Sequence, residues 1–576
     1  MLDFTSLPPG TLMILGALLV PLVPKKQQAW FALLLPVLSF FHLLNFTDGY
    51  TLNHIVMGIE LQPIRVDRLS LIFGYIFHIA AVLSGLYALK VEDPIQHLSG
   101  MVYAGAAISA VFCGDLISLF VFWELTAISS VFLIWASRSE DALHCGVRYL
   151  LVQVASGVIL LAGTMLHYQQ TGSVAFVNFV SGGGLSTATT VILWAIGIKA
   201  AFPFLHNWLQ DAYPKATYSG TVFLSAFTTK LAIYALARGF AGFSFLIPVG
   251  CLMTAFPIFF AVIENDLRKV LAYSLNNQLG FMVVGIGIGT QLSVDGACAH
   301  AFAHIIYKGL LFMCMGAVLY RTGTTKASEL GGLHRTMPWT TVFCIIGGMS
   351  ISAFPLFSGF AAKSLIASAA GYEQMAMVTF VLLFASAGVM EHSGIKIPFF
   401  AFFAHDSGKR PQEAPWNMLL AMGIAATLCI VIGVYPSALY ELLPNRAFDA
   451  HYNATYNAYS VTHVVTQLEL LLFAAFAFGI LMRWKVYPPE VPSVNLDFDW
   501  VYRKLLPRMV RSTWEIVQAM YAAGVEIISA RVKGHVGTIA NGIFGKNSPL
   551  GKDVESSFSA LWAAILLASY LILYYV

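Results

Sequence analysis

Residues 194–204 read WAIGIKAAFPF, a stretch in which a lysine and a proline interrupt an otherwise apolar run. It belongs to an apolar segment at 187–208, and about 20 such residues are needed to cross a bilayer as a helix. Pro203 lacks a backbone N–H and therefore breaks the helix locally. The stretch predicts a transmembrane helix that is broken at Pro203, with Lys199 buried beside the break.

A similar stretch, AFPL at 353–356, follows AFPF at 201–204 after five further apolar segments. Pro355 must break its helix as Pro203 does. Paired broken helices in corresponding positions are typical of transporters built from two repeats. Because five spans per repeat is an odd number, the second repeat is expected to enter the membrane inverted.

Composition supports a membrane protein along the whole chain. Of the 576 residues, 58% are hydrophobic and 11% are charged, whereas a soluble domain carries about 25% charged residues. The formal net charge of +3 does not suggest nucleic acid as a partner. We predict an all-α polytopic protein with about 16 transmembrane helices, by the rule of about 20 apolar residues per span. The spans are expected near 10–24, 28–46, 68–89, 98–113, 115–137, 145–167, 187–208, 217–238, 243–263, 269–290, 296–320, 339–370, 375–403, 416–437, 464–482 and 557–576.

Lysine and arginine alternate between the two sides of this arrangement. With the N-terminus outside, the outside loops carry few of them, chiefly Arg65, Arg238 and Arg446. Because inside loops are enriched in Lys and Arg, the pattern predicts both termini on the outer side, the periplasm for a bacterial inner-membrane protein. The predicted inside loops contain Lys25, Lys26, Lys90, Arg138, Lys215, Arg268, Lys269, Arg321, Lys326, Arg335, Lys409 and Arg410.

Ionisable residues inside the predicted spans are the candidate functional residues. Each costs at least roughly 2.5–3.5 kcal/mol at the bilayer centre. Taken singly, Lys396 can snorkel to the headgroups, a histidine can bind a carbonyl, and Glu124 can form a structural ion pair. As a set over consecutive spans they favour a function. The candidates are Glu124, Lys199, His206, Lys230, His300, His304, Lys308, Lys363, His392 and Lys396.

Their spacing favours proton transfer. His300, His304 and Lys308 recur every fourth residue and so form one stripe on a helix; His206 is expected two turns after Lys199 on the same face. Burial favours the neutral form of an ionisable group, and an opposite charge restores the charged form. A buried lysine that loses and regains its carboxylate partner therefore releases and takes up a proton.

Other chemistries fit this sequence less well. The His300–His304 spacing would suit a metal or a haem, but Lys308 on the same stripe would repel a cation. The seven cysteines contain no CxxC pair, and the sequence has no Walker phosphate loop. No cofactor is expected, and the presence of a metal is left open.

Several stretches resemble the antiporter-like membrane subunits of Mrp-type multisubunit cation/proton antiporters, respiratory complex I and membrane-bound hydrogenases. The similarity extends over about residues 100–400, and residues 220–238 and 395–418 are most similar to the D-type subunit of the Mrp-type antiporters. The matching stretches are FVFWELTAISS at 120–130, IKAAFPFLHNWLQDAYPKAT at 198–217, ENDLRKVLAYSLNNQLG at 264–280, HAFAHIIYKGLLFMCMGAVL at 300–319 and FPLFSGFAAKSLI at 354–366.

The resemblance implies a 14-helix core with two inverted five-helix repeats. It implies that Glu124 and Lys199 form a switching pair and that Lys363 is the terminal site. Lys230, His304 and Lys308 would form the central relay, with His206, His300, His392 and Lys396 as secondary candidates.

The expected organisation has five parts. These are N-terminal helices at 1–97, a first repeat at 98–240, a second repeat at 241–403, a fourteenth helix and loop at 404–463, and an extension at 464–576. Apolar residues recur every three or four positions between 484 and 556, which favours an amphipathic helix on the membrane surface or along a partner over a small soluble cap. Such an extension is similar to that of the largest antiporter-like subunit of complex I.

The sequence therefore predicts a transporter subunit rather than an enzyme. Its expected role is proton translocation coupled to a monovalent cation, Na⁺ first, together with other membrane subunits in the lipid bilayer. The alternatives are a proton-pumping subunit of a complex I-like NADH:quinone oxidoreductase or membrane-bound hydrogenase, driven by redox chemistry on other chains, and a subunit coupled to inorganic carbon uptake.

Overall fold

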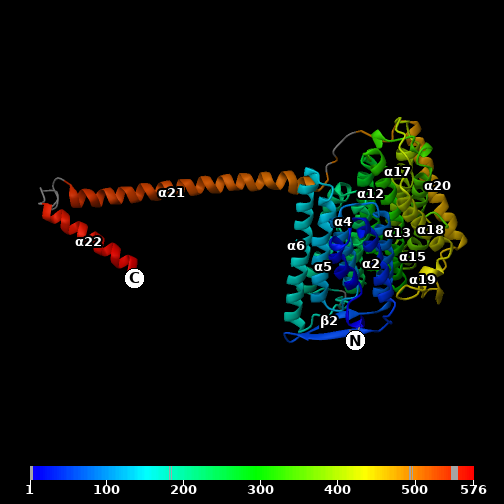
Figure 1. The fold of residues 1–576 in the computed structure, drawn as a ribbon, viewed down its shortest axis with the longest axis horizontal. Helices are drawn as coiled ribbons and strands as arrows, with labels where there is room; N and C mark the ends of the chain where they lie inside the picture. The colour runs from blue at the N-terminus through cyan, green and yellow to red at the C-terminus, as the bar shows by residue number, and fades with distance from the viewer. Residues whose placement is uncertain are drawn as a thin grey trace. The chain divides into compact units, whose positions relative to one another are not determined.

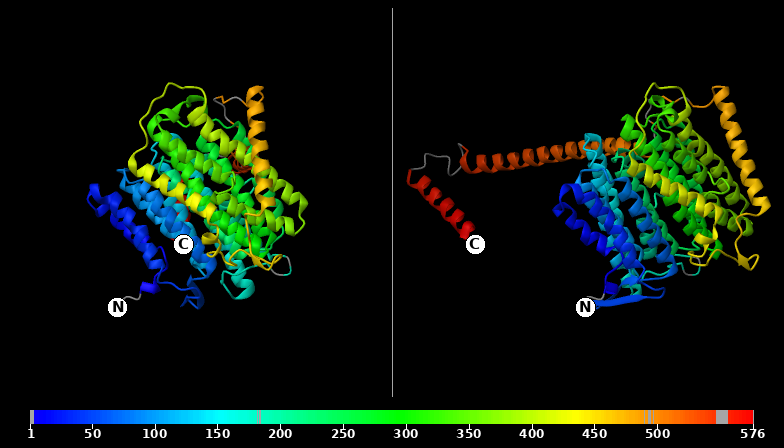
Figure 2. Two further views of the ribbon diagram at one scale, coloured as in Figure 1. Left: turned by 90° about the vertical axis from the view of Figure 1, so that its right-hand side faces the viewer. Right: turned by 45° about the vertical axis from the view of Figure 1, so that its right-hand side comes forward.

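The computed structural model describes residues 4–180, 182, 184–488, 490–491, 495, 497–545 and 556–575. They form two units, Met1–Asn495 and Leu496–Val576. In the first unit long helices run side by side, and the N-terminus lies at the end that carries the strand β2 (Figures 1 and 2).

The helices of the first unit follow the predicted spans closely. Nine helices of the described residues are long and apolar enough to cross a membrane, and four further apolar helices are shorter. The polytopic helical prediction is therefore confirmed. The helices are α1 Thr11–Leu19, α2 Lys25–Leu43, α3 Arg68–Tyr87, α4 Pro94–Val111, α5 Leu116–Trp135, α6 Glu140–Thr171, α7 Thr187–Lys199, α8 Asn207–Ala212, α9 Gly220–Ala226, α10 Thr228–Gly239, α11 Leu246–Ile263, α12 Leu267–Ile288, α13 Gln291–Thr322, α14 Pro338–Ile351, α15 Ser358–Tyr372, α16 Ala376–Val389, α17 Lys396–Pro398, α18 Trp416–Val434, α19 Ser437–Tyr440 and α20 Val461–Arg483.

An aspartate N-cap separates α4 from α5, the two spans that the sequence divides only at Gly114-Asp115. Asp115 Oδ1 accepts a hydrogen bond from the backbone N–H of Ser118 at 2.7 Å, which begins α5. Asp115 also forms a β-bridge with Ala175, and Asp266, which caps α12, forms the same kind of bridge with Lys326. The same local arrangement thus occurs in both halves of the bundle.

The two predicted helix breaks have the same geometry. Ala201 and Phe204 have φ angles of 60° and 70°, and the matching residues Ala353 and Leu356 have 59° and 74°. Because α7 ends at Lys199 and α8 begins only at Asn207, helical periodicity does not extend across the break. The expectation that His206 lies on the same helix face as Lys199 is therefore wrong.

Three features of the fold were not predicted. A two-stranded hairpin joins α2 to α3, with β1 Thr51–Val56 paired to β2 Ile59–Arg65, and a shorter pair joins β3 Phe448–Asp449 to β4 Ala454–Thr455. The all-α prediction holds for the helical bundle, and the two hairpins lie in loops between its helices. Met57 and Gly58, at φ 51° and 81°, form the tight turn between β1 and β2. A third helix break separates α9 from α10 at Phe227.

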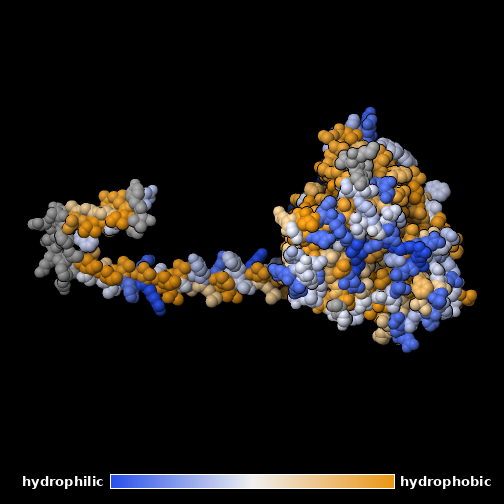
Figure 3. All heavy atoms as spheres, turned by 90° about the horizontal axis from the view of Figure 1, so that it is seen from below, coloured by the Kyte–Doolittle hydropathy of each residue, from blue (hydrophilic) through white to orange (hydrophobic). Residues whose placement is uncertain are grey.

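The second unit contains α21 Leu506–Phe544 and α22 Ser556–Tyr575. α21 has 39 residues and is thus about 58 Å long at 1.5 Å per residue. This one continuous helix occupies much of the predicted stretch 484–556, and its placement on the membrane surface or along a partner stays a prediction. Figure 3 shows hydrophobic and hydrophilic side chains along α21, and hydrophilic ones gathered on one end face of the first unit. The five-part division of the chain stays a prediction.

Candidate functional site

The end of α7 places Lys199 against α5. Lys199 is fully buried, and its Nζ donates to the carbonyl oxygen of Trp123 at 2.6 Å and to Thr126 Oγ1 at 3.0 Å. The ammonium also lies 4.4 Å from the centroid of the Trp123 ring, within cation–π range. Glu124 interacts electrostatically with Lys199, but its Oε1 has no hydrogen-bond partner among the described residues.

Helix α6 supports this pair from the other side. A Cβ placed on Gly157 would overlap Glu124 Oε1, so only glycine leaves room for the carboxylate. The neighbouring Ser156 accepts a hydrogen bond from Trp123 Nε1 at 3.0 Å and donates to the carbonyl oxygen of Ala195 at 2.7 Å. Helices α5, α6 and α7 are thus joined at the predicted switching pair.

Lys230 lies just after the break between α9 and α10. It is fully buried, and its Nζ donates to the carbonyl oxygen of Ser225 at 2.6 Å. Ser225 is in the last turn of α9, where the break at Phe227 leaves carbonyl groups without their usual helical donors. The broken helix therefore supplies the oxygen that binds this lysine.

His300 is part of a polar network between α12 and α13. Its Nε2 lies 3.1 Å from Gln278 Oε1 and 2.9 Å from the hydroxyl of Tyr307. Gln278 Nε2 in turn donates to Asn277 Oδ1 at 2.5 Å, and Asn277 donates to the carbonyl oxygen of Thr254. His300 therefore has partners that fix its ring.

His304 and Lys308 follow on the same stripe of α13, and both are fully buried. Within the described residues, neither ring nitrogen of His304 nor Lys308 Nζ has a hydrogen-bond partner. The His304 ring packs edge-on against Tyr307 at 5.3 Å. In proteins, buried polar groups of this kind are commonly bridged by internal water.

Lys363 sits on α15, after the second break. Its Nζ donates to the carbonyl oxygen of Ile351, the last residue of α14, at 2.7 Å, and lies 5.0 Å from the centroid of the Phe281 ring. Like Lys230, it binds a carbonyl that a helix break has left free.

His392 and Lys396 lie on the span 376–403, which contains π-helical turns at Met390–Ile395 and Phe399–Phe403. His392 Nδ1 lies 2.8 Å from Ser393 Oγ, which donates to Ser274 Oγ at 2.7 Å. The π-turns carry both residues into the bundle, and both are fully buried.

Lys396 does not snorkel to the surface. Its Nζ donates to the carbonyl oxygens of Val262 at 2.6 Å and Glu264 at 2.7 Å, and lies 2.9 Å from Glu490 Oε1. Burial raises the pKa of Glu490, although Lys396 acts in the opposite direction. The lysine thus joins the end of this span to the segment that follows α20.

Buried groups from α10, α13, α15 and the span 376–403 form one electrostatic cluster. His304 interacts with Lys230, Lys308 and Lys363, and His392 interacts with Lys308 and Lys363. The structure therefore brings these five predicted residues together. Glu124 and Lys199 form a separate pair at α5–α7, and His206 packs edge-on against Phe256 at 4.7 Å.

Sequence reasoning missed the buried amides. Gln278 and Asn277 join His300 to α11, and Gln153 and Gln210 are fully or nearly fully buried on α6 and α8. The run Asn276-Asn277-Gln278 inside an apolar helix was the available signal. Within the described residues no group of three or more His, Cys, Asp or Glu side chains is placed to hold a metal ion.

Part of this chain is similar to known membrane proteins. Residues 113–390 match the family described as "NADH:quinone oxidoreductase/Mrp antiporter, TM". The A-type subunit of the Na⁺/H⁺ antiporter of Alkalihalophilus pseudofirmus is 30% identical over 508 residues, which cover 78% of this chain and 63% of that relative. The D-type subunit from the same organism is 28% identical, and the match covers 58% of this chain and 71% of that relative.

Solved structures also match the fold. A chain of the Mrp complex from Dietzia sp. DQ12-45-1b has a TM-score of 0.69 at 22% identity, and the match covers 79% of this chain and 98% of that one. A chain of an archaeal membrane-bound sulfane sulfur reductase has a TM-score of 0.70 at 21% identity, with 98% of this chain and 100% of that one covered. The broken helices of this multi-pass membrane protein, and its buried Lys199, Lys230, Lys308 and Lys363, lie within the residues that match the family described as "NADH:quinone oxidoreductase/Mrp antiporter, TM".

Proposed function

We propose that this chain is the proton-translocating subunit of a multisubunit monovalent cation/proton antiporter, with Na⁺ as the cation. The observation that carries the proposal is the cluster of fully buried Lys230, His304 and Lys308, whose burial would be a large cost without a function. The similarity to the A-type and D-type antiporter subunits supports the cation. The chain spans less than two thirds of the A-type relative, at 63% of its length.

In this proposal Glu124 and Lys199 switch, and protons pass through the buried cluster to Lys363. Lys199 is charged when Glu124 is near and releases its proton when the carboxylate moves away, because an isolated charge is unfavourable in a dry site. His392 in the cluster and His300 beside it act as secondary relay groups, while His206 and Lys396 act at its edges. The protein works in the inner membrane of a bacterium with both termini outside, beside other membrane subunits.

The second candidate is a proton-pumping subunit of a redox-driven membrane complex, in which electron transfer takes place on other chains. The specific observation in its favour is the fold match to a chain of the sulfane sulfur reductase complex, which extends over 98% of this chain and so includes the C-terminal unit. The match to the Mrp chain covers less, at 79%.

Proton flux in everted vesicles that contain the whole complex separates the two candidates. A Na⁺ or K⁺ gradient imposed without an electron donor should move protons, and the movement should be lost in Lys199→Met. Proton movement that occurs only after NADH or another reductant is added would instead establish the redox-driven pump. If neither driving force moves protons through the unaltered complex, the proposed function is wrong.

A further inference from the structure

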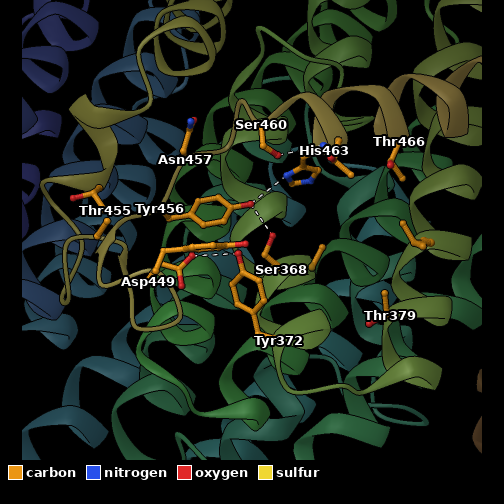
Figure 4. A pocket seen from close by; sticks show the side chains of 15 residues that line it. Ser368, Tyr372, Thr379, Asp449, Thr455, Tyr456, Asn457, Ser460, His463 and Thr466 are labelled. Carbon is orange, nitrogen blue, oxygen red and sulfur yellow. Dashed lines mark hydrogen bonds between the residues drawn. The ribbon is translucent and has the colours of Figure 1, made fainter.

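A large cavity lies beside α15, in part outside the residues that match the family. It has a volume of about 560 Å³ and lies between the ends of α15 and α16, the loop 449–460 and the start of α20. Figure 4 shows Ser368, Tyr456 and His463 around its inner part. Tyr452, at its outer part, is 67% exposed, whereas Tyr456 is 6% exposed. The cavity therefore leads from the surface loop toward the interior.

A second, smaller cavity continues inward to Lys363. Its volume of about 30 Å³ is enough for at least one water molecule. His463 lines both cavities, as do Ala367 and Leu383. Lys363 and the surface loop are thus connected through two adjoining spaces that share one titratable side chain.

Helix α20 is held against the second break by Gln467. Its Nε2 donates to the carbonyl oxygen of Ser352 at 3.3 Å, and Lys363 Nζ donates to the preceding carbonyl, that of Ile351, at 2.7 Å. His463 lies one turn before Gln467, so both side chains face the same side of α20. The helix therefore presents His463 toward the second break, where Lys363 binds the carbonyl oxygen of Ile351.

Hydrogen bonds orient the His463 ring. Its Nδ1 lies 3.2 Å from the hydroxyl of Tyr456, which is 2.7 Å from Ser368 Oγ. The ring also packs against Phe360, with the centroids 5.2 Å apart. At the outer part Asp449 is almost fully buried and accepts from the hydroxyl of Tyr372 at 3.2 Å. A carboxylate there favours protons and hydronium over anions.

We propose that these cavities are the aqueous path between Lys363 and one side of the membrane, and that His463 is the proton-carrying residue at the inner end of that path. In the outward direction, the Lys363 ammonium gives a proton through water to the neutral imidazole, which leaves a neutral amine. The imidazolium then passes the proton to water in the large cavity. The inference rests on the proposed function, which names Lys363 as the terminal site.

The test is His463→Ala in the assembled complex, measured as proton flux in vesicles under the driving force that works for the unaltered complex. The flux should fall on the order of 10²-fold, in the range that a positioned proton-transferring side chain contributes. Added imidazole should restore flux, because the vacated cavity admits it. His451→Ala is the matched control: His451 lies on the exposed loop and stacks on Tyr372 at 4.9 Å, and its variant should keep full flux.

A second variant tests the path itself. Thr466→Cys places a thiol on the cavity wall that α20 forms, and a charged, membrane-impermeant thiol reagent added on that side should then block flux. The unaltered chain, treated in the same way, is the control for its seven native cysteines. Full flux in both His463→Ala and labelled Thr466→Cys would overturn the inference while leaving the proposed function intact. Loss of flux in His463→Ala without imidazole rescue would also overturn it, because a packing role predicts that result.

Discussion

Lys199 binds the backbone of Trp123, the residue directly before Glu124, rather than the Glu124 carboxylate. The Nζ–O distance is 2.6 Å, and the centroid of the Trp123 ring lies 4.4 Å from the same ammonium. With its hydrogen bond to Thr126 Oγ1 at 3.0 Å, the lysine keeps three interactions that do not depend on the charge of Glu124. A lysine that separates from its carboxylate needs other partners for its ammonium. An ammonium that could interact only with Glu124 would stay bound to it.

Lys199→Met removes the charge and keeps much of the side-chain length. We expect proton flux to fall on the order of 10²-fold, as for loss of a positioned proton-transferring group, with unchanged assembly because the methionine fills the same apolar space. Glu124→Gln should reduce flux in the same way. Flux per assembled complex is the measurement, and normal transport by both variants would rule out the pair as a switch.

Gly157→Ala should disturb Glu124 without changing any ionisable residue. The added Cβ would overlap Glu124 Oε1, so the carboxylate must leave its position. We expect several-fold lower flux, since displacement of a transferring group weakens its proton exchange. Gly479→Ala on α20 is the control, because its Cβ would meet no atom within 4 Å. Equal flux in the two variants would show that the position of Glu124 does not matter.

Lys396→Met should destabilise the complex through Glu490. It would leave a buried carboxylate without its ion pair, and breaking such a pair costs about 3–5 kcal/mol. Glu490→Gln alone should have a smaller effect, because Lys396 keeps the carbonyl oxygens of Val262 and Glu264. The double variant should recover most of the stability. Thermal inactivation midpoints of the purified complex give the comparison, and additive losses would show that the two residues are independent.

Asp67 predicts a pH dependence of stability. Its burial raises the pKa, but the hydrogen bond and charge of Arg238 outweigh burial and leave the pKa below its usual value of 3.8. A carboxyl with a lowered pKa stabilises the fold above its unfolded pKa, and this stability is lost as the pH falls through the lowered value. Asp67→Ala should therefore lower the thermal inactivation midpoint at neutral pH and have less effect in strong acid.

A control separates the charge of Asp67 from its role as the N-cap of α3, a role worth about 1 kcal/mol. Asp93→Ala removes the N-cap of α4, a long hydrogen bond from Gln96 Nε2 at 3.5 Å and a 3.5 Å contact with the exposed Arg138. The midpoint should fall more for Asp67→Ala than for Asp93→Ala at neutral pH. Equal losses at every pH would mean that the Arg238 ion pair contributes nothing.

The sequence by itself determined the positions of the helices and of both proline-associated breaks, and it identified the buried ionisable residues. These follow from local rules: apolar length, proline geometry and the cost of charge in a bilayer. The third break at Phe227, by contrast, involves neither proline nor glycine, so no local signal predicted it. The hairpin 51–65 was missed because a short exposed loop carries little hydrophobic pattern.

Only the tertiary structure decided which groups meet. The binding of Lys199 to Trp123, of Lys363 to Ile351 and of Lys396 to Glu490 joins residues on different helices or on either side of a break. The packing of helices sets such contacts, and a single sequence contains no period or spacing that encodes them. His206 illustrates the limit, since its expected helix face disappeared once the chain turned at Ala201 and Phe204.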